Sequence, residues 1–192
     1  MAYASLERFR DITGRNVLAL QQAKEAGKKV VGQYCIYSPL EIALAAGAIP
    51  VSLCGTKNDS IPVAETMLPR SLCPLIKSSF GFALQDSCPY LAASDIVVAD
   101  TTCDGKKKMY ELLAAYKPVV LLQLPQIQDG DAKDYWRAQY AKLAARLEKD
   151  FGASITTDDL RDAVRLTNRL RRALKDVLDL AKRKPSPLTG MD

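Results

Sequence analysis

Cysteine carries most of the possible chemistry of this sequence, because histidine is absent. The 192 residues contain five cysteines and no histidine, which removes the commonest general base and a common zinc ligand. Five thiols without any sign of secretion favour thiol or metal chemistry over a framework of disulfides. They are widely separated in the sequence, at Cys35, Cys54, Cys73, Cys88 and Cys103.

The spacing of the cysteines argues against several kinds of site. Structural zinc sites usually take paired ligands from Cys-x-x-Cys, and the sequence contains no such pair. A mechanism like that of cysteine proteases lacks its histidine base. Widely spaced thiolates in loops suit an iron–sulfur cluster better than a mononuclear zinc ion. Neither Gly-x-Gly-x-x-Gly nor a P-loop is present, so we expect no nicotinamide cofactor and no ATP hydrolysis by this chain.

Apolar runs that alternate with helical patterns predict the elements that position these thiols. Four apolar runs predict buried strands, at residues 29–35, 49–53, 95–100 and 118–124. Helical patterns are found at residues 5–26, 39 to about 47, 74 to about 84, from 89, 107–116, 132–151 and 157–182. We therefore expect an α/β fold with a four-stranded parallel sheet flanked by helices, Rossmann- or flavodoxin-like, with an N-terminal helix and long C-terminal helices. Ser38, before Pro39 and Glu41, predicts a capping box for the second helix.

This topology directs all five thiols to one rim of the sheet. Cys35 and Cys54 end the first two strands, and Cys103 follows the third. Cys73 and Cys88 each precede a proline that can open a helix. The carboxyl ends of parallel strands and the N-termini of the following helices share one edge, where ligands bind. A helix N-terminus also favours the thiolate, the form that binds metal.

Each cysteine has a plainer interpretation as a small buried hydrophobe, since cysteine is among the most buried residue types. This alternative fits Cys54 best, because it ends the apolar run Val51-Ser-Leu-Cys54, and Cys88 next. It fits Cys73 and Cys103 least, because both lie in polar loops marked by proline or glycine.

Charged residues beside Cys103 have ordinary explanations. Asp100 and Asp104 are expected to be a strand-end hydrogen-bond acceptor and a helix cap, not an acid–base pair. The run Lys106-Lys107-Lys108 could attract phosphate, but we expect a solvated turn.

Composition and charge narrow the possible partners. A net charge of +5 does not require a nucleic acid or an anionic membrane. The basic run at residues 161–184 is interpreted as a solvated helix face, with a docking surface for an acidic partner or a CoA phosphate as the alternative. No signal peptide is visible at residues 1–10, and no apolar run approaches the roughly 20 residues of a membrane helix. We therefore expect a soluble, cytoplasmic protein with no nucleic-acid and no membrane partner.

Two strings around cysteines are distinctive: Leu68-Pro-Arg-Ser-Leu-Cys73-Pro-Leu-Ile-Lys-Ser-Ser-Phe-Gly81 and Ala99-Asp-Thr-Thr-Cys103-Asp-Gly-Lys-Lys-Lys-Met-Tyr-Glu-Leu-Leu113. They resemble the two cluster-binding segments of the 2-hydroxyacyl-CoA dehydratase family, which includes benzoyl-CoA reductase subunits and the double-cubane cluster proteins. The segments Gly32-Gln-Tyr-Cys35 and Ala46-Gly-Ala-Ile-Pro50 also fit. The resemblance runs through nearly the whole chain and corresponds to the N-terminal half of family members.

The resemblance implies an iron–sulfur cofactor, of the 4Fe-4S or the double-cubane type. Cys73 and Cys103 match two cysteines that ligate the cluster in the family. Cys35 matches a further cysteine of the double-cubane branch, so these three are the predicted metal ligands. Family members accept a low-potential electron from an ATP-hydrolysing activator protein, and the dehydratases use it to expel the hydroxyl group of a 2-hydroxyacyl-CoA.

One departure concerns the length of the chain. Family members are about twice as long, and a second similar domain supplies further ligands. We expect residues 1–152 to form the α/β cluster-binding domain with its N-terminal helix, and residues 153–192 to form a long helix and linker towards a second domain absent here. The missing ligands are then expected from that second domain or from a homologous subunit, unless Cys88 or Cys54 substitutes for them.

The predicted function is that of an iron–sulfur component of a 2-hydroxyacyl-CoA dehydratase-like lyase of anaerobic metabolism. It would accept electrons from the ATP-dependent activator for reductive dehydration of an acyl-CoA. The alternatives are a double-cubane reductase of small molecules and a truncated, non-catalytic scaffold with empty cysteines. Lys77, Ser78 and Ser79, which follow Cys73, are predicted to contact cluster sulfide or substrate; a solvent-facing polar stretch is the alternative.

Overall fold

Four parallel strands form the centre of the fold, in the order β2-β1-β3-β4. The computed structural model describes residues 4–188, and the side chains of residues 11, 12 and 14–188. The strands are β1 (Val30–Tyr34), β2 (Ile49–Leu53), β3 (Ile96–Asp100) and β4 (Val119–Leu122). Because β2 and β3 pair with β1 on opposite sides, the direction of the connections reverses at β1. The topological switch point, where ligands bind in such sheets, therefore lies between β1 and β3.

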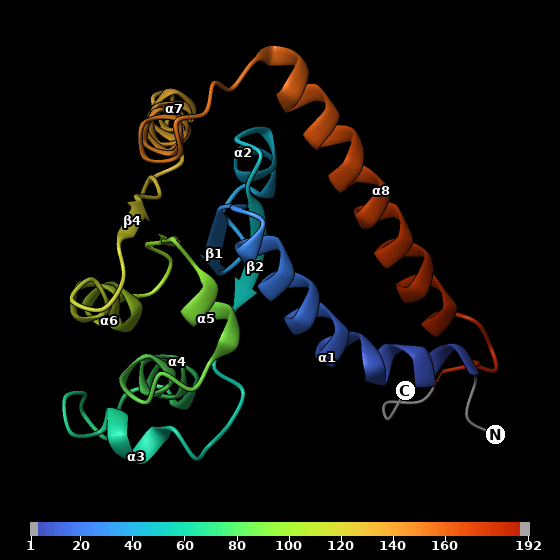
Figure 1. Ribbon diagram of the computed structural model, residues 1–192, viewed down its shortest axis with the longest axis horizontal. Helices are drawn as coiled ribbons and strands as arrows, with labels where there is room; N and C mark the ends of the chain where they lie inside the picture. Colours follow the sequence, from blue (N-terminus) through green and yellow to red (C-terminus); the bar gives the residue numbers. More distant parts are fainter. Residues whose placement is uncertain (1–3, 189–192) are drawn as a thin grey trace.

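Eight helices surround the strands in the part of the chain that is described (Figure 1). They are α1 (Ala4–Glu25), α2 (Leu40–Ala45), α3 (Ile61–Ala64), α4 (Pro74–Leu84), α5 (Pro89–Ala93), α6 (Asp104–Leu113), α7 (Ala132–Phe151) and α8 (Thr157–Ala181). The α/β class, the four strands and the long C-terminal helices confirm the fold expected from the sequence. Every helix in the described residues is too short or too polar to cross a membrane.

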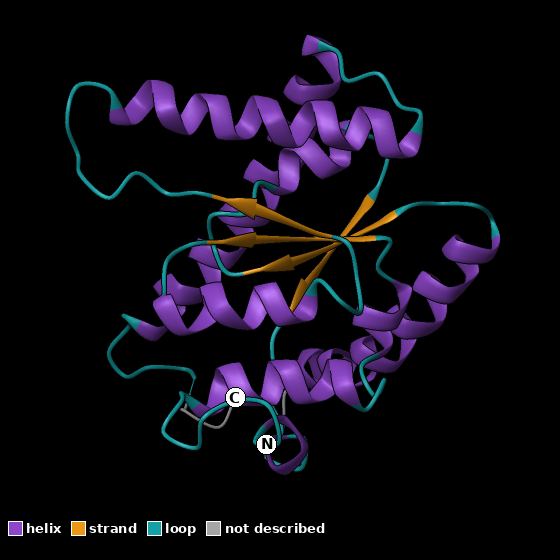
Figure 2. Ribbon diagram, turned by 90° about the vertical axis from the view of Figure 1, so that its left-hand side faces the viewer, coloured by secondary structure: helices purple, strands orange, loops and turns teal. Residues whose placement is uncertain are grey.

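The sheet is covered on both faces, and Figure 2 shows the strands between two layers of helices. Val97 and Ala99 pack into the core beneath α4, α5 and α6. Ile96 and Val98 point to the other face, into the core beneath α2 and α7. All five residues of β3 are buried, which explains why this strand is a continuous apolar run in the sequence.

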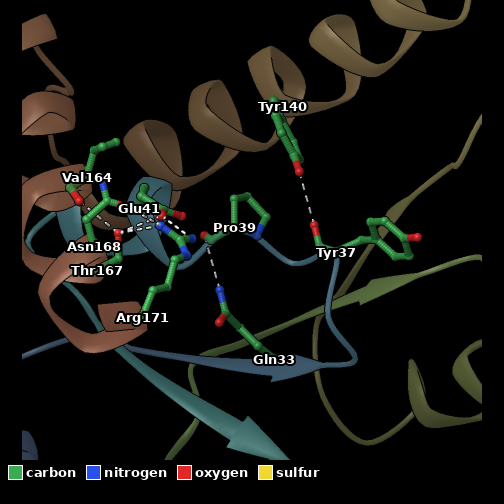
Figure 3. A network of polar contacts seen from close by, with 9 residues as sticks. All are labelled: Gln33, Tyr37, Pro39, Glu41, Tyr140, Val164, Thr167, Asn168 and Arg171. Carbon is green, nitrogen blue, oxygen red and sulfur yellow. Dashed lines mark hydrogen bonds and ion pairs between the residues drawn. The ribbon is translucent and has the colours of Figure 1, made fainter. Parts of the chain in front are cut away.

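Helix α8 is attached to the rest of the fold mainly through α2 (Figures 1 and 3). Glu41 of α2 accepts hydrogen bonds from Thr167 Oγ1 at 2.7 Å and from Arg171 Nη2 at 2.6 Å. Beyond this contact α8 keeps a row of exposed apolar side chains, Leu166, Leu170, Leu174, Val177 and Leu178.

Two local predictions were wrong. The capping box at Ser38 does not form, because the Ser38 hydroxyl donates to the carbonyls of Tyr34 and Val98, and α2 begins after Pro39 without a side-chain cap. Helix α6 begins at Asp104, three residues before the predicted start. The short α3 was not predicted either; it follows the polar loop after β2.

Candidate functional site

The cysteines follow the ends of strands or precede helices, as the sequence predicted. Cys35 and Cys54 directly follow β1 and β2. Cys73, Cys88 and Cys103 are the residues immediately before α4, α5 and α6. All five are free thiols.

The backbone of Cys35 has an unusual conformation. Its φ is +65°, in the left-handed region that residues other than glycine rarely adopt. Such a conformation costs on the order of 1–3 kcal/mol and persists only where the surroundings hold it. Cys35 lies at the switch point of the sheet, so this strained residue is located where ligands bind in such folds.

Lys106, on the helix that follows Cys103, contacts the thiol of Cys35. Its Nζ donates a short hydrogen bond to Cys35 Sγ. Burial by itself lowers the pKa of Lys106, but the hydrogen bond to Cys35 and the charges of Cys35, Asp100 and Cys103 outweigh this effect and raise it. The ammonium group therefore stays charged, between the two loops that carry predicted ligands.

The expected solvated turn was wrong, because all three lysines lie in α6; Lys107 and Lys108 still reach the surface. Lys107 pairs with Asp104 at 2.9 Å, and Lys108 forms a similar pair within α6. Asp104 is the first residue of α6 and is not the helix cap that we expected, because the cap position belongs to Cys103.

Tyr110 places a buried hydroxyl group near Cys35. The residue is 1% exposed, and its hydroxyl has no hydrogen-bond partner among the described residues. Burial, then the charge of Cys35 and a contact with the Cys35 side chain, raise the pKa of Tyr110 well above its usual range, so the hydroxyl stays protonated. A buried hydroxyl without a well-formed hydrogen bond costs about 1–3 kcal/mol.

The start of α6 packs against the segment that carries Cys73. A Cβ added at Gly105 would lie 2.7 Å from Leu72 Cδ1 and 3.0 Å from Ile76 Cδ1. These two residues flank Cys73. The absence of a side chain at Gly105 therefore lets the Cys73 and Cys103 segments approach each other.

Tyr34, at the end of β1, lies near the remaining thiols. Burial, followed by the charges of Cys88, Cys54 and Cys35, raises the pKa of Tyr34 beyond its usual range. Cys88 is half-buried, and its Sγ accepts a hydrogen bond from the backbone N–H of Leu91 at 3.5 Å. This contact favours a local structural role for Cys88.

The interpretation of Cys54 as a buried hydrophobe was wrong, because Cys54 is exposed. It leaves the sheet at the edge strand β2, and the next residue, Gly55, occupies the space against α4. A Cβ on Gly55 would overlap the backbone of Ser78 and Ser79.

Lys77, Ser78 and Ser79 are buried, so the alternative of a solvent-facing stretch was wrong. Lys77 Nζ donates to Glu65 Oε1 at 2.7 Å and to the Arg70 carbonyl at 2.8 Å. These bonds fasten the chain before Cys73 to the helix after it.

The two serines hold the earlier part of the same connection. Ser78 Oγ donates to the Lys57 carbonyl at 2.6 Å, and Ser79 Oγ accepts the Gly55 N–H at 2.9 Å. The polar atoms of Lys77, Ser78 and Ser79 thus have partners within the protein. Direct contact with a substrate would require some of these bonds to break.

Sequence reasoning missed Lys106 and Tyr110 as parts of the site. They are four residues apart on α6 and therefore share one face of the helix that begins after Cys103. Their spacing was the available signal, but the contact with Cys35 spans 71 residues.

No three cysteines, aspartates or glutamates within the described part of the chain are placed to hold one metal ion. The thiolates of a four-iron cluster each bind a different iron, so they need not converge on one ion. The predicted ligands Cys35, Cys73 and Cys103 are all free thiols, a donor type that fits an iron–sulfur cluster, and the charged Lys106 contacts one of them, Cys35.

Two hollows lie elsewhere, on both sides of the free edge of β2. One, of about 710 Å³, is lined by α2, α8 and the edge residues Pro50 and Ser52. The other, of about 570 Å³, is lined by α1, by Tyr90 and by the same edge residues. Neither is lined by a cysteine.

Comparison with known proteins gives a consistent result. The model of the family described as "2-hydroxyglutaryl-CoA dehydratase, D-component" matches residues 35–192. "Putative dehydratase subunit YjiM" of Escherichia coli is 47% identical over 190 residues, covering 98% of this chain and 50% of that protein. The beta subunit of (R)-2-hydroxyglutaryl-CoA dehydratase of Acidaminococcus fermentans is 26% identical over 187 residues, 95% of this chain and 48% of that subunit. A benzoyl-CoA reductase subunit of Thauera aromatica is 28% identical over 182 residues, 91% of this chain and 46% of that protein.

The chain thus spans about half the length of the curated relatives it matches. All three relatives carry the word subunit in their names.

Proposed function

Because the chain belongs to the 2-hydroxyglutaryl-CoA dehydratase D-component family, we propose that it is the iron–sulfur component of a 2-hydroxyacyl-CoA dehydratase-like enzyme. The observation that carries the proposal is the placement of free thiols at the switch point of the sheet, with Lys106 between the Cys35 and Cys103 loops.

In this proposal Cys35, Cys73 and Cys103 hold the cluster. A cluster held by three thiolates from this chain would supply single electrons and an iron able to act as a Lewis acid. Lys106 would offset the negative charge of the thiolates. Tyr110 would donate its free hydroxyl hydrogen to a sulfur atom beside Cys35, which would remove the cost of its present isolation.

Lys77, Ser78 and Ser79 would contribute to substrate binding indirectly. Their hydrogen bonds shape the connection from Gly55 to Cys73, which forms one wall of the rim. A substrate on the rim would meet the exposed start of α4, while the three side chains keep that wall in place.

The partners follow from the family and from the length of the chain. We propose an ATP-hydrolysing activator as the electron donor and an acyl-CoA as the substrate. The counterpart of the relatives' other half would supply further cluster ligands, whether as a second domain or as a homologous subunit. The exposed apolar row on α8 supports such a counterpart, because a contiguous exposed apolar patch is typical of a surface that binds another protein.

A double-cubane reductase of small molecules is the second candidate, and one observation favours it. The chain carries five free thiols, whereas one four-iron cluster takes four cysteine ligands. An acyl-CoA binding assay by calorimetry separates the two functions, since the dehydratase should bind acyl-CoA and the reductase should not.

Anaerobic reconstitution with iron and sulfide tests the proposal. The wild-type chain should take up iron and acid-labile sulfide in similar amounts, and Cys103→Ser should lose both. Cys54→Ser is the matched control, because it removes an exposed thiol next to β2 and should keep the cluster. If Cys103→Ser kept its iron and sulfide while Cys54→Ser lost them, the ligand assignment would be contradicted. A colourless, iron-free wild-type chain, even when mixed with its counterpart, would favour the non-catalytic scaffold.

A further inference from the structure

A single carboxylate ties together the loops that carry Cys35 and Cys103. Asp100, the last residue of β3, is completely buried. Its Oδ2 accepts the backbone N–H of Tyr37 at 3.3 Å. Its Oδ1 accepts the backbone N–H of Thr102 at 3.3 Å and the Thr102 hydroxyl at 2.6 Å. Asp100 is thus the strand-end acceptor predicted from the sequence, but its partners come from two different loops.

These two loops are the ones at the switch point. Tyr37 is two residues after Cys35, and Thr102 is the residue before Cys103. The loops follow β1 and β3, which are neighbours in the sheet. A rigid carboxylate that binds the backbone of both loops therefore fixes the distance between them.

The far end of the Cys35 loop is tethered separately (Figure 3). The Tyr140 hydroxyl donates to the Tyr37 carbonyl at 3.3 Å, and Gln33 Nε2 donates to the Pro39 carbonyl at 3.3 Å. These bonds attach the loop to α7 and to its own strand. They do not involve the loop of Cys103.

Lys106 also bridges the two loops, but in a different way. Its ammonium contacts the sulfur of Cys35 itself, so this contact must change when the sulfur binds a metal. Asp100 binds the backbone N–H groups of Tyr37 and Thr102 and the Thr102 hydroxyl, none of them a sulfur atom, so metal binding by the thiols does not require these bonds to break. A carboxylate in this position must also overcome a desolvation cost, which its three hydrogen bonds from two loops offset.

We propose that Asp100 is a positioning residue that sets the spacing of Cys35 and Cys103 for a shared metal group. The metal group rests on the proposed function. The effect of Asp100 on the thiols of the metal-free chain does not.

Asp100→Asn in the full chain tests this role with little change of shape. An amide has one accepting oxygen, which can satisfy the two Thr102 donors, and its NH₂ would then face the N–H of Tyr37. The substitution should therefore release the Cys35 loop selectively. Thr102→Val is a second variant that removes one donor on the Cys103 side without touching a buried charge.

Asp95→Asn is the matched control, because Asp95 lies just before the opposite end of β3. It accepts hydrogen bonds from Lys24 Nζ at 2.8 Å and from the Val30 N–H at 2.7 Å. The control thus breaks comparable bonds on the same strand, far from the rim.

The first readout is the alkylation rate of each thiol in the metal-free chain, resolved by peptide mass spectrometry with iodoacetamide. Asp100→Asn should raise the Cys35 rate about fivefold, the effect of losing roughly one buried hydrogen bond on loop opening, and should leave Cys54 unchanged. Thr102→Val should raise the Cys103 rate. Equal Cys35 rates in Asp100→Asn and Asp95→Asn would overturn the proposal.

The second readout is the electron paramagnetic resonance spectrum of the reduced, reconstituted protein. Asp100→Asn should shift or broaden the cluster signal, whereas Asp95→Asn should keep the wild-type spectrum. A Cys35 effect in a chain that binds no iron would support the positioning role and contradict the proposed function. Normal iron binding with no change in either readout would contradict the positioning role alone.

Discussion

The rim at the carboxyl ends of β1 and β3 and the open side formed by the β2 edge and α8 are organised in opposite ways. At the rim, buried polar groups are joined across loops, as Asp100 and Lys77 show. On the open side, Leu170 and Leu174 are 50% and 56% exposed, and two hollows flank the strand edge. The rim therefore has fixed geometry, and the open side has apolar area that stays exposed within the described residues.

This difference suggests two kinds of occupant. A small prosthetic group needs ligands held at fixed positions, which is what the hydrogen bonds of the rim provide. A protein partner needs apolar area, and helix α8 offers it. Pro50 on the edge strand β2 disfavours a further strand there, because proline cannot donate to the ladder. We therefore expect a helical surface as the counterpart on this side.

The largest expected effect tests how tightly the α4 side is packed. A Cβ at Gly81 would overlap the carbonyl of Ser60, whereas Gly14 in α1 has open space around it. Gly81→Ala should lower the free energy of unfolding by about 3 kcal/mol or more, and Gly14→Ala should raise it by about 0.5–1 kcal/mol. Urea unfolding checks both. A similar increase in the free energy of unfolding of Gly81→Ala and Gly14→Ala would show that α4 is not held against the Ser60 segment.

The second prediction is a substitution that stabilises the metal-free chain and weakens the retention of iron in the reconstituted chain. Tyr110→Phe removes a buried hydroxyl that has no partner in the described residues, so it should stabilise the metal-free chain by about 1 kcal/mol. In the reconstituted chain the same change should speed the loss of iron, because a donor near Cys35 is missing. Tyr116→Phe, which alters an exposed ring, should change neither thermal stability nor iron loss. A destabilised metal-free Tyr110→Phe variant would contradict the view that this hydroxyl forms its hydrogen bond only to a bound group.

The third prediction concerns the attachment of α8 and its dependence on pH. Burial raises the pKa of Glu41, but the hydrogen bonds from Thr167 and Arg171 outweigh it and lower the pKa overall. The attachment is therefore fully present above the unfolded-state value of about 4.3 and is lost as the pH falls through the lower folded value.

Glu41→Gln should thus destabilise the chain at pH 7 by at most about 1 kcal/mol, since Arg171 is half-exposed. The difference from the wild type should shrink below about pH 4, as urea titrations at both pH values would show. Asp158→Asn, which removes an exposed pair with Arg161, is the control. If the loss of stability caused by Glu41→Gln grew as the pH fell, the Glu41 carboxylate would not be what attaches α8.

The smallest effect on stability is expected on the open side. Leu174→Ser should change the free energy of unfolding by less than about 0.5 kcal/mol, because the side chain is mostly in solvent. It should, however, weaken association with the part of the Escherichia coli relative that this chain does not match, produced separately and followed by size-exclusion chromatography. Binding that is unaffected by Leu174→Ser would remove α8 as the docking surface.

The strands and the placement of the cysteines could be predicted from the sequence. The side-chain contacts that the sequence did not predict were missed for physical reasons. The four strands are apolar runs, and β1 and β3 are buried throughout, so local pattern was sufficient to place them. Cys73 was correctly placed at a helix start because Pro74 opens α4. Ser38 was misassigned because its hydroxyl is bonded to Val98, 60 residues away on a neighbouring strand. Lys106 was hidden in a run of three lysines, and only its contact with Cys35, 71 residues away, separates it from its neighbours. Pattern reveals the elements, whereas the partners of polar side chains depend on the assembled sheet.

Iron K-edge X-ray absorption of the anaerobically reconstituted chain tests most directly whether the rim holds a cluster. The proposal predicts sulfur atoms around the iron together with iron–iron scattering, and loss of both features in Cys73→Ser. Iron surrounded by oxygen or nitrogen, with no iron–iron scattering in the wild-type chain, would contradict it.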